Sequence, residues 1–422
     1  MTAQTVGRSR TTFGPAVGLR CRECGEGYDI GPRYVCEQCF GPLEVAYDFG
    51  TVTRESIESG PRNIWRYRGL LPVVPDVTRT PNTEPGCTRL VRADNLAREL
   101  GLRRLWLKDD TGNPTHSFKD RVVAVALAAA RALGFSVLAC PSTGNLANAV
   151  AAAAARGGIH SVVFVPQNLE QQKITTTAVY GGTLVAVDGN YDDVNRLASE
   201  LAGEFEDWAF VNVNVRPYYA EGSKTLGFEI AEQLGWRLPD QVVVPVASGA
   251  QLTKVDKAFG ELTALGLVEE HPYRVFGAQA TGCSPVAQAF KDGHDVVRPV
   301  KPDTIAKSLA IGNPADGPYV LDIARRTGGA VADVSDEEIV GGIRLLARAE
   351  GIFAETAGGV TVAVLKKLAE AGQLDPDAET AAIISGDGLK TLDAVSAVAK
   401  PSATIAPSVD AFHRVQKEVG LA

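Results

Sequence analysis

The sequence has no excess of basic residues and no long apolar run. Its 42 Lys and Arg are outnumbered by 50 Asp and Glu, which gives a net charge of −8 and a pI of about 5.4. Proteins that bind nucleic acid usually carry a basic patch, so we expect no nucleic-acid partner. No run of 18 apolar residues is free of charged or turn-forming residues, so no membrane span is expected. The N-terminus lacks the apolar core of a signal peptide, which favours a cytoplasmic protein.

Cysteines are also few, and four of the seven fall into two close pairs, Cys21 with Cys24 and Cys36 with Cys39. In a long chain without a signal peptide, such pairs favour a metal over disulfides. Residues 19–48 contain too few apolar side chains for a core of their own, and four thiolates at this spacing suit tetrahedral zinc. We therefore expect a zinc-ribbon-like unit with a closed, structural site, whose loss harms stability more than chemistry. The alternative is a cysteine cluster that has lost its metal and is held by docking on the main body.

From about residue 104, short β-branched runs alternate with longer runs of helical composition. Strands are expected at 104–110, 136–142, 160–166, 183–189, 208–214, 240–248, 273–280 and 380–386, and helices at 118–134, 145–158, 191–205, 224–235, 252–266, 335–351 and 358–372. Strands separated by helices of ten or more residues predict parallel sheet with crossover helices. Residues 52–89 show no clear periodicity and are interpreted as a connector that wraps the main body.

Ligands of open α/β sheets bind where strands end and helices begin, so the loops after strands are the candidate sites. In "NPTHSFKDR", residues 113–121, Lys119 falls in the first turn of an expected helix. A cation there opposes the helix dipole, which disfavours the ammonium form. A lysine of lowered pKa, shielded by Phe118, suits a Schiff base. The alternative is a surface lysine paired with Asp120.

Four further loops carry small or polar residues, and each has a plain capping or turn alternative. Ser142, Thr143, Gly144 and Asn145 form a strand-to-helix junction that could hold a carboxylate. Residues 245–254, "PVASGAQLTK", have the geometry of a phosphate cradle but match neither G-x-x-x-x-G-K-[ST] nor G-x-G-x-x-G. Ser385 ends a strand before two glycines, and Glu355 precedes a helix of small residues.

Together these segments resemble the fold-type II pyridoxal-phosphate enzymes, and among them most closely the threonine synthases. The resemblance covers about residues 19–400 and rests on "NPTHSFKDR" (113–121), "STGN" (142–145), "EGSKTLGFEIAEQLG" (221–235), "ATGCSPV" (280–286), "SLAIGNPADG" (308–317), "EGIFAET" (350–356) and "SGDGLK" (385–390). The segment "GCTRL" is similar to the family's G-x-T-P-L, with Arg89 in place of Pro. Two departures are a phosphate loop, "ASGAQL", poorer in Gly and Asn than the family's, and His116, which we interpret as a bystander rather than a proton relay.

The resemblance implies a tryptophan synthase β-like α/β fold with two open, twisted, mostly parallel sheets flanked by helices. The implied parts are a flexible tail at 1–18, the ribbon at 19–48, a larger α/β domain of 49–112 with 215–422, and a smaller one of 113–214. It also implies a homodimer, a pyridoxal 5'-phosphate cofactor and a phosphorylated amino acid as the small-molecule substrate.

The resemblance further implies roles for particular residues. Lys119 would be both the Schiff-base lysine and the base. The implied cofactor ligands are Lys119, Phe118, Asn145 (3'-oxygen), Ser248, Gly249, Ala250, Gln251 and Leu252 (phosphate), and Ser385 (pyridine nitrogen), and the implied substrate ligands are Ser142, Thr143, Gly144, Asn145 and Lys224. The implied reaction removes phosphate from O-phospho-L-homoserine and adds water to give L-threonine. Alternatives are a cysteate synthase or a threonine or serine dehydratase on this fold, a cofactor-binding protein without catalysis, and a zinc-ribbon interaction protein.

Overall fold

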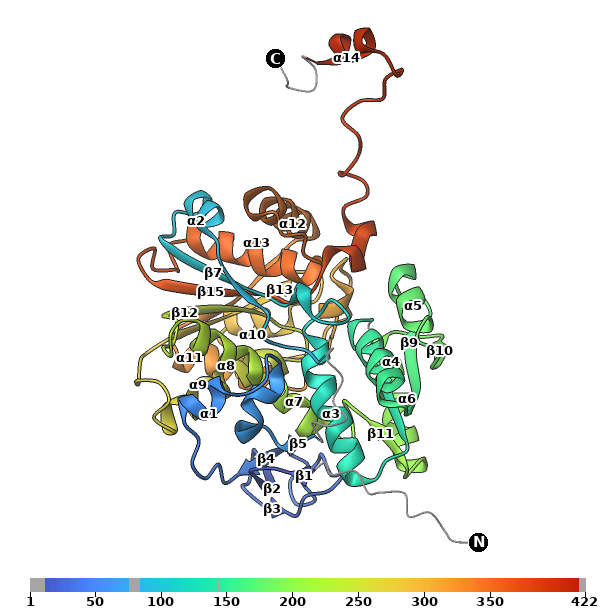
Figure 1. Ribbon diagram of the computed structural model, residues 1–422, viewed down its shortest axis with the longest axis vertical. Helices are drawn as coiled ribbons and strands as arrows, with labels where there is room; N and C mark the ends of the chain where they lie inside the picture. Colours follow the sequence, from blue (N-terminus) through green and yellow to red (C-terminus); the bar gives the residue numbers. More distant parts are fainter. Residues whose placement is uncertain (1–11, 76–83, 143, 417–422) are drawn as a thin grey trace.

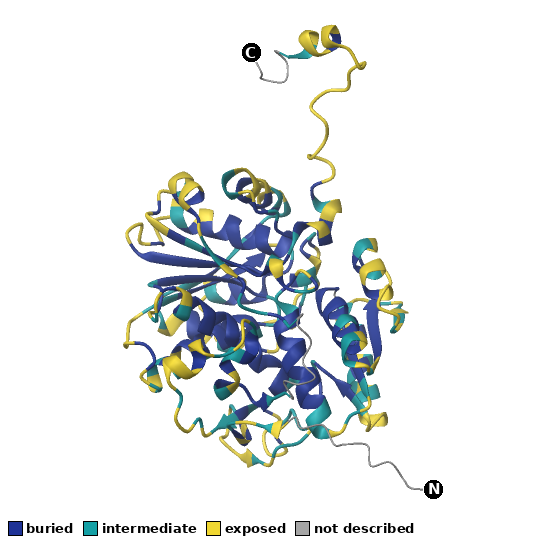
Figure 2. Ribbon diagram, in the orientation of Figure 1, coloured by how far each residue is buried: buried dark blue, intermediate teal, exposed yellow. Residues whose placement is uncertain are grey.

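The computed structural model describes residues 12–75, 84–142 and 144–416 (Figure 1). Two α/β parts lie side by side above a small N-terminal sheet, and the segment that ends in α14 (Val409–Val415) extends away from the body. Strands and inward helix faces are buried, whereas residues 396–410 are exposed (Figure 2). Within the described residues, no helix is long and apolar enough to cross a membrane.

The N-terminal sheet is antiparallel and has the order β3-β2-β4. Its strands are β2 (Ala16–Cys21), β3 (Gly27–Tyr28) and β4 (Leu43–Tyr47), and a separate pair joins β1 (Thr12–Phe13) to β5 (Val73–Val74). The prediction of a flexible tail over 1–18 is wrong for residues 12–18, because Ala16 packs into the core and the strand is paired on both sides. Residues 1–11 lie outside the described residues.

The larger sheet has six strands in the order β14-β13-β12-β15-β7-β6, all parallel except the β6–β7 pair. The strands are β6 (Arg89–Arg92), β7 (Arg104–Asp109), β12 (Gln241–Pro245), β13 (Arg274–Ala280), β14 (Ala330–Val334) and β15 (Glu379–Ile384). One face is covered by α8 (Lys224–Gln233), α9 (Ala250–Ala264), α10 (Pro285–Lys291) and α11 (Gly317–Arg326). The other is covered by α2 (Asp94–Leu100), α12 (Asp336–Glu350) and α13 (Thr356–Glu370).

The smaller sheet is fully parallel, with the order β10-β9-β8-β11. It consists of β8 (Val137–Pro141), β9 (His160–Pro166), β10 (Thr183–Val187) and β11 (Trp208–Phe210), with α3 (Lys119–Leu133), α4 (Asn145–Gly157), α5 (Gln171–Ala178) and α6 (Tyr191–Glu204). Alanine-rich α3 is buried along most of its length, because small side chains let α4 and α7 (Arg216–Glu221) approach closely. The remaining helical turns are α1 (Arg54–Glu58), η1 (Ile64–Leu70), η3 (Asp110–Gly112), η4 (Lys307–Leu309) and η5 (Gly388–Ala394).

The predicted fold class is confirmed, and all eight expected strands and seven expected helices are present. The strand expected at 208–214 stops at Phe210, because the Asn214 side chain accepts the Phe210 N–H at 2.9 Å and turns the chain. The connector at 52–89 contains α1, η1 and β5 within its described residues. Strands β6 and β14 were not predicted.

Candidate active site

A cavity of about 410 Å³ lies where loops from both parallel sheets meet. Its wall includes the ends of β8, β12 and β15 and the starts of α3, α4, α9 and α13, as expected for an open α/β sheet. The structure brings nine predicted site residues into this wall: Phe118, Lys119, Ser142, Asn145, Ser248, Gly249, Ala250, Gln251 and Ser385. Thr143 lies outside the described residues.

Lys119 is the first residue of α3, and its amine lies in the cavity. Its Nζ donates a hydrogen bond to the Tyr219 hydroxyl at 3.0 Å and lies 4.6 Å from the Phe118 ring centre. The Phe118 N–H donates to the Ser385 carbonyl at 2.9 Å, which ties this turn to the end of β15. Burial lowers the pKa of Lys119 to about 8, although the Glu355 carboxylate opposes the shift. An appreciable share of the amine is therefore neutral, as a nucleophile or base requires.

Asn145 and Glu355 form a buried pair across the cavity wall. The Asn145 Nδ2 donates to both Glu355 carboxylate oxygens, at 2.8 and 2.9 Å, and the Glu355 N–H donates to the Gly386 carbonyl at 2.9 Å. We noted Glu355 in the sequence but did not predict it as a site residue. The signal was its place between the "EGIF" segment and a helix of small residues.

The loop before α9 has the features of a phosphate cradle. Gly249 has φ 97°, and a Cβ there would lie 2.8 Å from Val320 and 2.9 Å from Asp316 side-chain atoms, so only glycine fits without strain. The first N–H groups of a helix have no intrahelical acceptor and attract anions. Leu252 does not line the cavity, because its side chain packs into the core, which leaves only its backbone N–H for a phosphate.

In the loop before α4, the Ser142 hydroxyl caps the start of the helix. The Ser142 hydroxyl accepts the N–H groups of Gly144 at 2.9 Å and Ala147 at 2.8 Å. Gly144 has φ 121°, and a Cβ there would lie 2.1 Å from the buried side chain of Lys173. Gly144 is not part of the cavity wall. For the Ser142 hydroxyl and for Gly144, the alternative prediction of a helix-capping loop therefore holds.

Four buried polar atoms of the cavity wall find no hydrogen-bond partner among the described residues. They are Asn145 Oδ1, Asn212 Oδ1, Gln251 Nε2 and Ser308 Oγ. A buried polar atom without a partner costs about 1–3 kcal/mol, so these atoms indicate a polar ligand. An anion cradle at α9, a partly neutral lysine and unpaired acceptors and donors between them fit pyridoxal phosphate.

Lys224 is not brought to the cavity. It is fully buried, and its Nζ donates to the Leu70 carbonyl at 2.8 Å and pairs with Glu221 at 2.8 Å and Glu261 at 2.9 Å. All three donors are therefore used inside the protein, which corrects the prediction that Lys224 contacts substrate. His116 is exposed, outside the cavity wall, and hydrogen-bonds through Nδ1 to the Thr111 carbonyl oxygen at 3.2 Å, as a bystander would.

Sequence reasoning also missed residues of α7 and of the ribbon. Arg216 and Tyr219 line the cavity, and among its described lining residues Lys119 and Arg216 are the only Lys or Arg. The "RPYY" run that contains them matches no motif, and its one local signal is a proline at a helix start. Ribbon residues also form part of the wall, namely Tyr34, Val35, Phe40 and Pro42. The ribbon therefore touches the site that it was expected only to stabilise.

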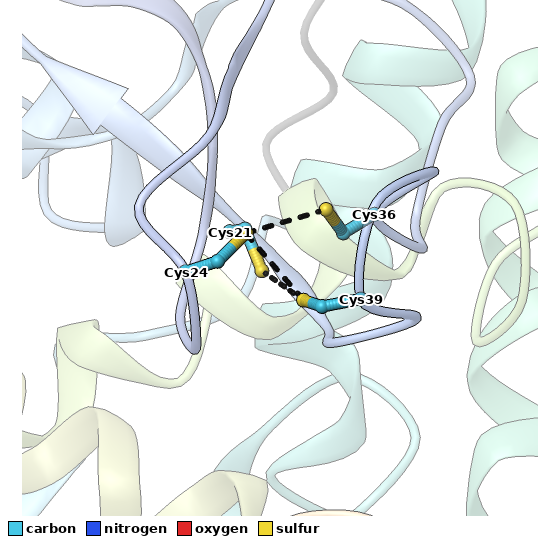
Figure 3. Close-up of side chains that lie close together, drawn as sticks. All are labelled: Cys21, Cys24, Cys36 and Cys39. Carbon is cyan, nitrogen blue, oxygen red and sulfur yellow. Dashed lines mark hydrogen bonds between the residues drawn. The ribbon is translucent and has the colours of Figure 1, made fainter.

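The four ribbon cysteines converge (Figure 3). Their Sγ atoms lie within 4.8 Å of one another, with Cys21–Cys39 at 3.4 Å, Cys24–Cys39 at 3.5 Å and Cys24–Cys36 at 3.6 Å. Tetrahedral zinc with Zn–S bonds of about 2.3 Å needs sulfurs about 3.8 Å apart, close to these separations. Backbone N–H groups of Glu23 and Gln38 point at Cys21 and Cys36 sulfurs, each at 3.4 Å. The cluster therefore fits a structural zinc ion.

Comparison with known proteins agrees with this geometry. The chain matches the family model described as pyridoxal-phosphate dependent enzyme over residues 82–386. Threonine synthase of Methanocaldococcus jannaschii is 38% identical over 407 residues, covering 95% of this chain and 99% of that protein. Threonine synthase of Methanosarcina acetivorans is 35% identical over 94% of this chain and 97% of its own length.

Solved structures show the same fold at lower identity. A fungal L-serine ammonia-lyase from Rhizomucor miehei aligns with a TM-score of 0.62 at 21% identity, covering 74% of this chain and 96% of that one. An O-ureido-L-serine synthase aligns with a TM-score of 0.60 at 23% identity, covering 79% and 98%. On the family match and the full-length relatives, the chain belongs to the pyridoxal-phosphate-dependent enzymes and, within them, to the threonine synthase family.

Proposed function

We propose that the cavity converts O-phospho-L-homoserine and water into L-threonine and phosphate, with pyridoxal phosphate held by Lys119. The observation that carries this proposal is a lysine of lowered pKa in a cavity that also contains an N-terminal helix cradle and a second cation, Arg216. Two anion sites and one amine match a phosphorylated cofactor and a phosphorylated amino acid. The relatives that cover almost all of the chain are threonine synthases, which supports this substrate.

Most of the reaction is proton movement, and Lys119 is placed for it. When bound, pyridoxal phosphate supplies an electron sink that stabilises negative charge on the substrate carbon next to the amine. The neutral Lys119 amine takes the proton from that carbon and then one from the β carbon, and phosphate leaves from the γ carbon with the electron pair of its C–O bond. One proton returns to the γ carbon, the hydroxyl of water adds at the β carbon, and the α carbon is reprotonated last. Burial raises the pKa of Tyr219, so its hydroxyl stays protonated and orients the Lys119 Nζ at 3.0 Å.

We assign the remaining groups by charge and position. The α9 N-terminus, from Ser248 to Leu252, would hold the cofactor phosphate through its backbone N–H groups. Arg216 would hold the substrate phosphate, because it is the other Lys or Arg among the described residues of the wall. Ser385 would meet the pyridine nitrogen, and a hydroxyl there leaves that nitrogen neutral.

The Asn145 assignment needs a specific hydrogen-bond arrangement. Its Nδ2 already donates to Glu355, at 2.8 and 2.9 Å, while its Oδ1 has no partner among the described residues. Contact of Asn145 with the cofactor 3'-oxygen would therefore use Oδ1 as an acceptor, or release Nδ2 from Glu355.

Product analysis tests the function. The holoenzyme is incubated with O-phospho-L-homoserine and, separately, with O-phosphoserine plus sulfite, L-threonine or L-serine. Threonine and equimolar phosphate from the first substrate are expected, whereas cysteate or a 2-oxo acid as the main product would identify one of the alternative activities. Lys119→Ala should abolish product formation, and Lys366→Ala, at an exposed position of α13, should not.

We also propose that Cys21, Cys24, Cys36 and Cys39 bind one zinc ion. Metal analysis of protein purified without chelator should find one zinc per chain. Protein with less than about a tenth of that amount, at unchanged thermal stability, would favour a cluster that has lost its metal.

A further inference from the structure

Arg22 extends from the metal-binding loop of the ribbon toward the body of the protein. It lies between Cys21 and Cys24, so any metal held by these thiols fixes its backbone. Its guanidinium carbon lies 3.5 Å from the centre of the Tyr319 ring, and its Nη1 donates to Asp316 Oδ1 at 3.4 Å. The Tyr319 hydroxyl in turn donates to Glu23, the next residue of the loop. The loop is therefore joined to the start of α11 by several independent contacts.

Asp316 contacts both candidate anion sites of the cavity. Its Oδ2 accepts from Arg216 Nη2 at 2.7 Å, and its backbone N–H donates to the Ser248 carbonyl at 2.8 Å. Its Cβ also lies against Gly249, the residue that opens α9. Asp316 is only 5% exposed and pairs with two arginines, Arg22 on one oxygen and Arg216 on the other.

A second connection runs from the ribbon sheet to α9. Glu44 in β4 pairs with Arg22 at 3.3 Å and with Lys254 of α9 at 2.6 Å. Arg22 is thus held between two carboxylates, Glu44 and Asp316. These two ion pairs and the Tyr319 ring restrain the guanidinium.

Because Arg22 shares the Asp316 carboxylate, Arg216 keeps donors that can reach the cavity. A guanidinium has five N–H donors, and Arg216 uses one of them, at Nη2, on Asp316. If Arg22 were absent, the buried carboxylate would be neutralised by Arg216 alone, which favours a bidentate pair. Such a pair would rotate Arg216 toward Asp316 and remove donors from the cavity.

We propose that Arg22 is a positioning residue that makes the ribbon part of the active site. Through Asp316 it keeps Arg216 directed at a phosphate group in the cavity. The proposal rests on the proposed function for the identity of the substrate, whose phosphate is the expected ligand. The phosphate of the cofactor could also be the ligand of Arg216, and the experiment distinguishes it from the substrate phosphate.

The test uses the holoenzyme with its cofactor fixed by borohydride, so that the cofactor phosphate site is filled. Inorganic phosphate is titrated into wild type, Arg22→Gln, Arg22→Lys, Arg216→Gln and Arg20→Gln by calorimetry. Loss of a charge-assisted contact predicts phosphate affinity about 10-fold weaker in Arg22→Gln, with partial recovery in Arg22→Lys. Arg216→Gln should bind phosphate more weakly still. Arg20→Gln, at an exposed position of β2, should match wild type.

Two further measurements identify which phosphate is involved. Pyridoxal phosphate affinity of the cofactor-free variants should stay within about 3-fold of wild type, and the substrate KM of Arg22→Gln should rise about 10-fold with kcat nearly unchanged. A loss of cofactor affinity with unchanged phosphate binding would overturn the substrate assignment. Unchanged values for both ligands in Arg22→Gln would overturn the positioning role.

Zinc content and thermal stability are measured on every variant. If Arg22→Gln loses zinc, phosphate binding is measured in Asp316→Asn instead. That variant keeps the ribbon sequence intact and removes the carboxylate that Arg22 and Arg216 share. Asp316→Asn should then weaken phosphate binding by a similar factor, and wild-type affinity in it would refute the proposal. A wild type that makes no threonine but binds phosphate through Arg216 would refute the proposed function alone.

Discussion

The lowered pKa of Lys119 predicts how fast the cofactor-free protein captures pyridoxal phosphate as pH changes. Burial brings the pKa from 10.5 to about 8, and the Glu355 carboxylate limits the shift. At pH 7 the neutral fraction is then roughly 0.1, against about 0.0003 for an exposed lysine, a difference of ~300-fold. Since only the neutral amine attacks an aldehyde, covalent attachment should rise with pH and level off above a midpoint of about 8.

The assay follows the absorbance change when cofactor-free protein is mixed with limiting pyridoxal phosphate from pH 6 to 10.5. Borohydride reduction and peptide mapping then locate the label, which should be on Lys119. A midpoint at or above about pH 10, or a label on another lysine, would refute the reasoning.

Glu355 offers a matched test of the electrostatic cause. Its carboxylate raises the pKa of Lys119, so Glu355→Gln should move the midpoint below that of wild type. Asn145→Ala removes the hydrogen-bond partner of Glu355 but no charge, and its midpoint should stay near the wild-type value. Equal midpoints in Glu355→Gln and wild type would show that the Glu355 carboxylate does not raise the pKa of Lys119.

The same shift predicts the pH dependence of stability. Between the folded pKa of about 8 and the unfolded value near 10.5, the unfolded chain binds more protons at Lys119, so stability rises with pH across this window. Below pH 8 the full penalty remains, on the order of 3 kcal/mol. Lys119→Met should therefore stabilise the cofactor-free protein at pH 7 in urea unfolding, with a smaller gain at pH 10. A gain that is equal at both pH values would contradict this account.

Three further predictions concern other parts of the structure. Ser385→Asp should fold but lose most activity, because a carboxylate would favour a protonated cofactor ring; wild-type turnover would place Ser385 away from the ring. Arg121→Met should cost about 3–5 kcal/mol in denaturant unfolding, because it leaves the buried Asp110 carboxylate without its ion-pair partner and Glu229 with Lys108 alone. Arg103→Met, at an exposed pair, should cost under about 1 kcal/mol. Cys36→Ser with Cys39→Ser should remove zinc, lower the melting temperature and raise the substrate KM. If the melting temperature falls but the substrate KM is unchanged, the ribbon contributes to stability and not to substrate binding.

Strands and the loops that join them to helices were predictable because their signals are local. Runs such as 162–166, "VVFVP", are apolar over most of a strand, and loop 245–254 changes from strand to helix composition within a few residues. Strand β14, "AVADV", has two alanines and an aspartate at the edge of its sheet, and β6, "RLVR", has only four residues. Neither carries an apolar run long enough to be identified alone.

Contacts between distant segments account for the rest. Asn145 and Glu355 are 210 residues apart, and Arg22 and Asp316 are 294 apart, so no local pattern links them. Lys224 illustrates the opposite error. Its motif matched the family, but its amine is also bound by Glu261 and by the Leu70 carbonyl, both distant in the sequence, as well as by Glu221 three residues before it.

The run Lys119-Asp120-Arg121 shows why three adjacent charges need not form a solvated face. Successive residues of a helix point about 100° apart, so the three side chains leave α3 in three directions. Lys119 enters the cavity, while Asp120 is buried and accepts the Thr115 N–H at 2.7 Å and its hydroxyl at 2.8 Å, which closes the loop before the helix.

Arg121 completes this arrangement. Its fully buried guanidinium pairs with Asp110, just after β7, at 2.7 Å, and with Glu229 of α8 at 2.6 Å. Both partners belong to the larger sheet and its helices, whereas α3 packs with the smaller sheet. The same turn that presents the amine of Lys119 is thus fixed to both halves of the structure. A lysine anchored in this way keeps its distance from the α9 cradle, which is the geometric condition for one cofactor to reach both.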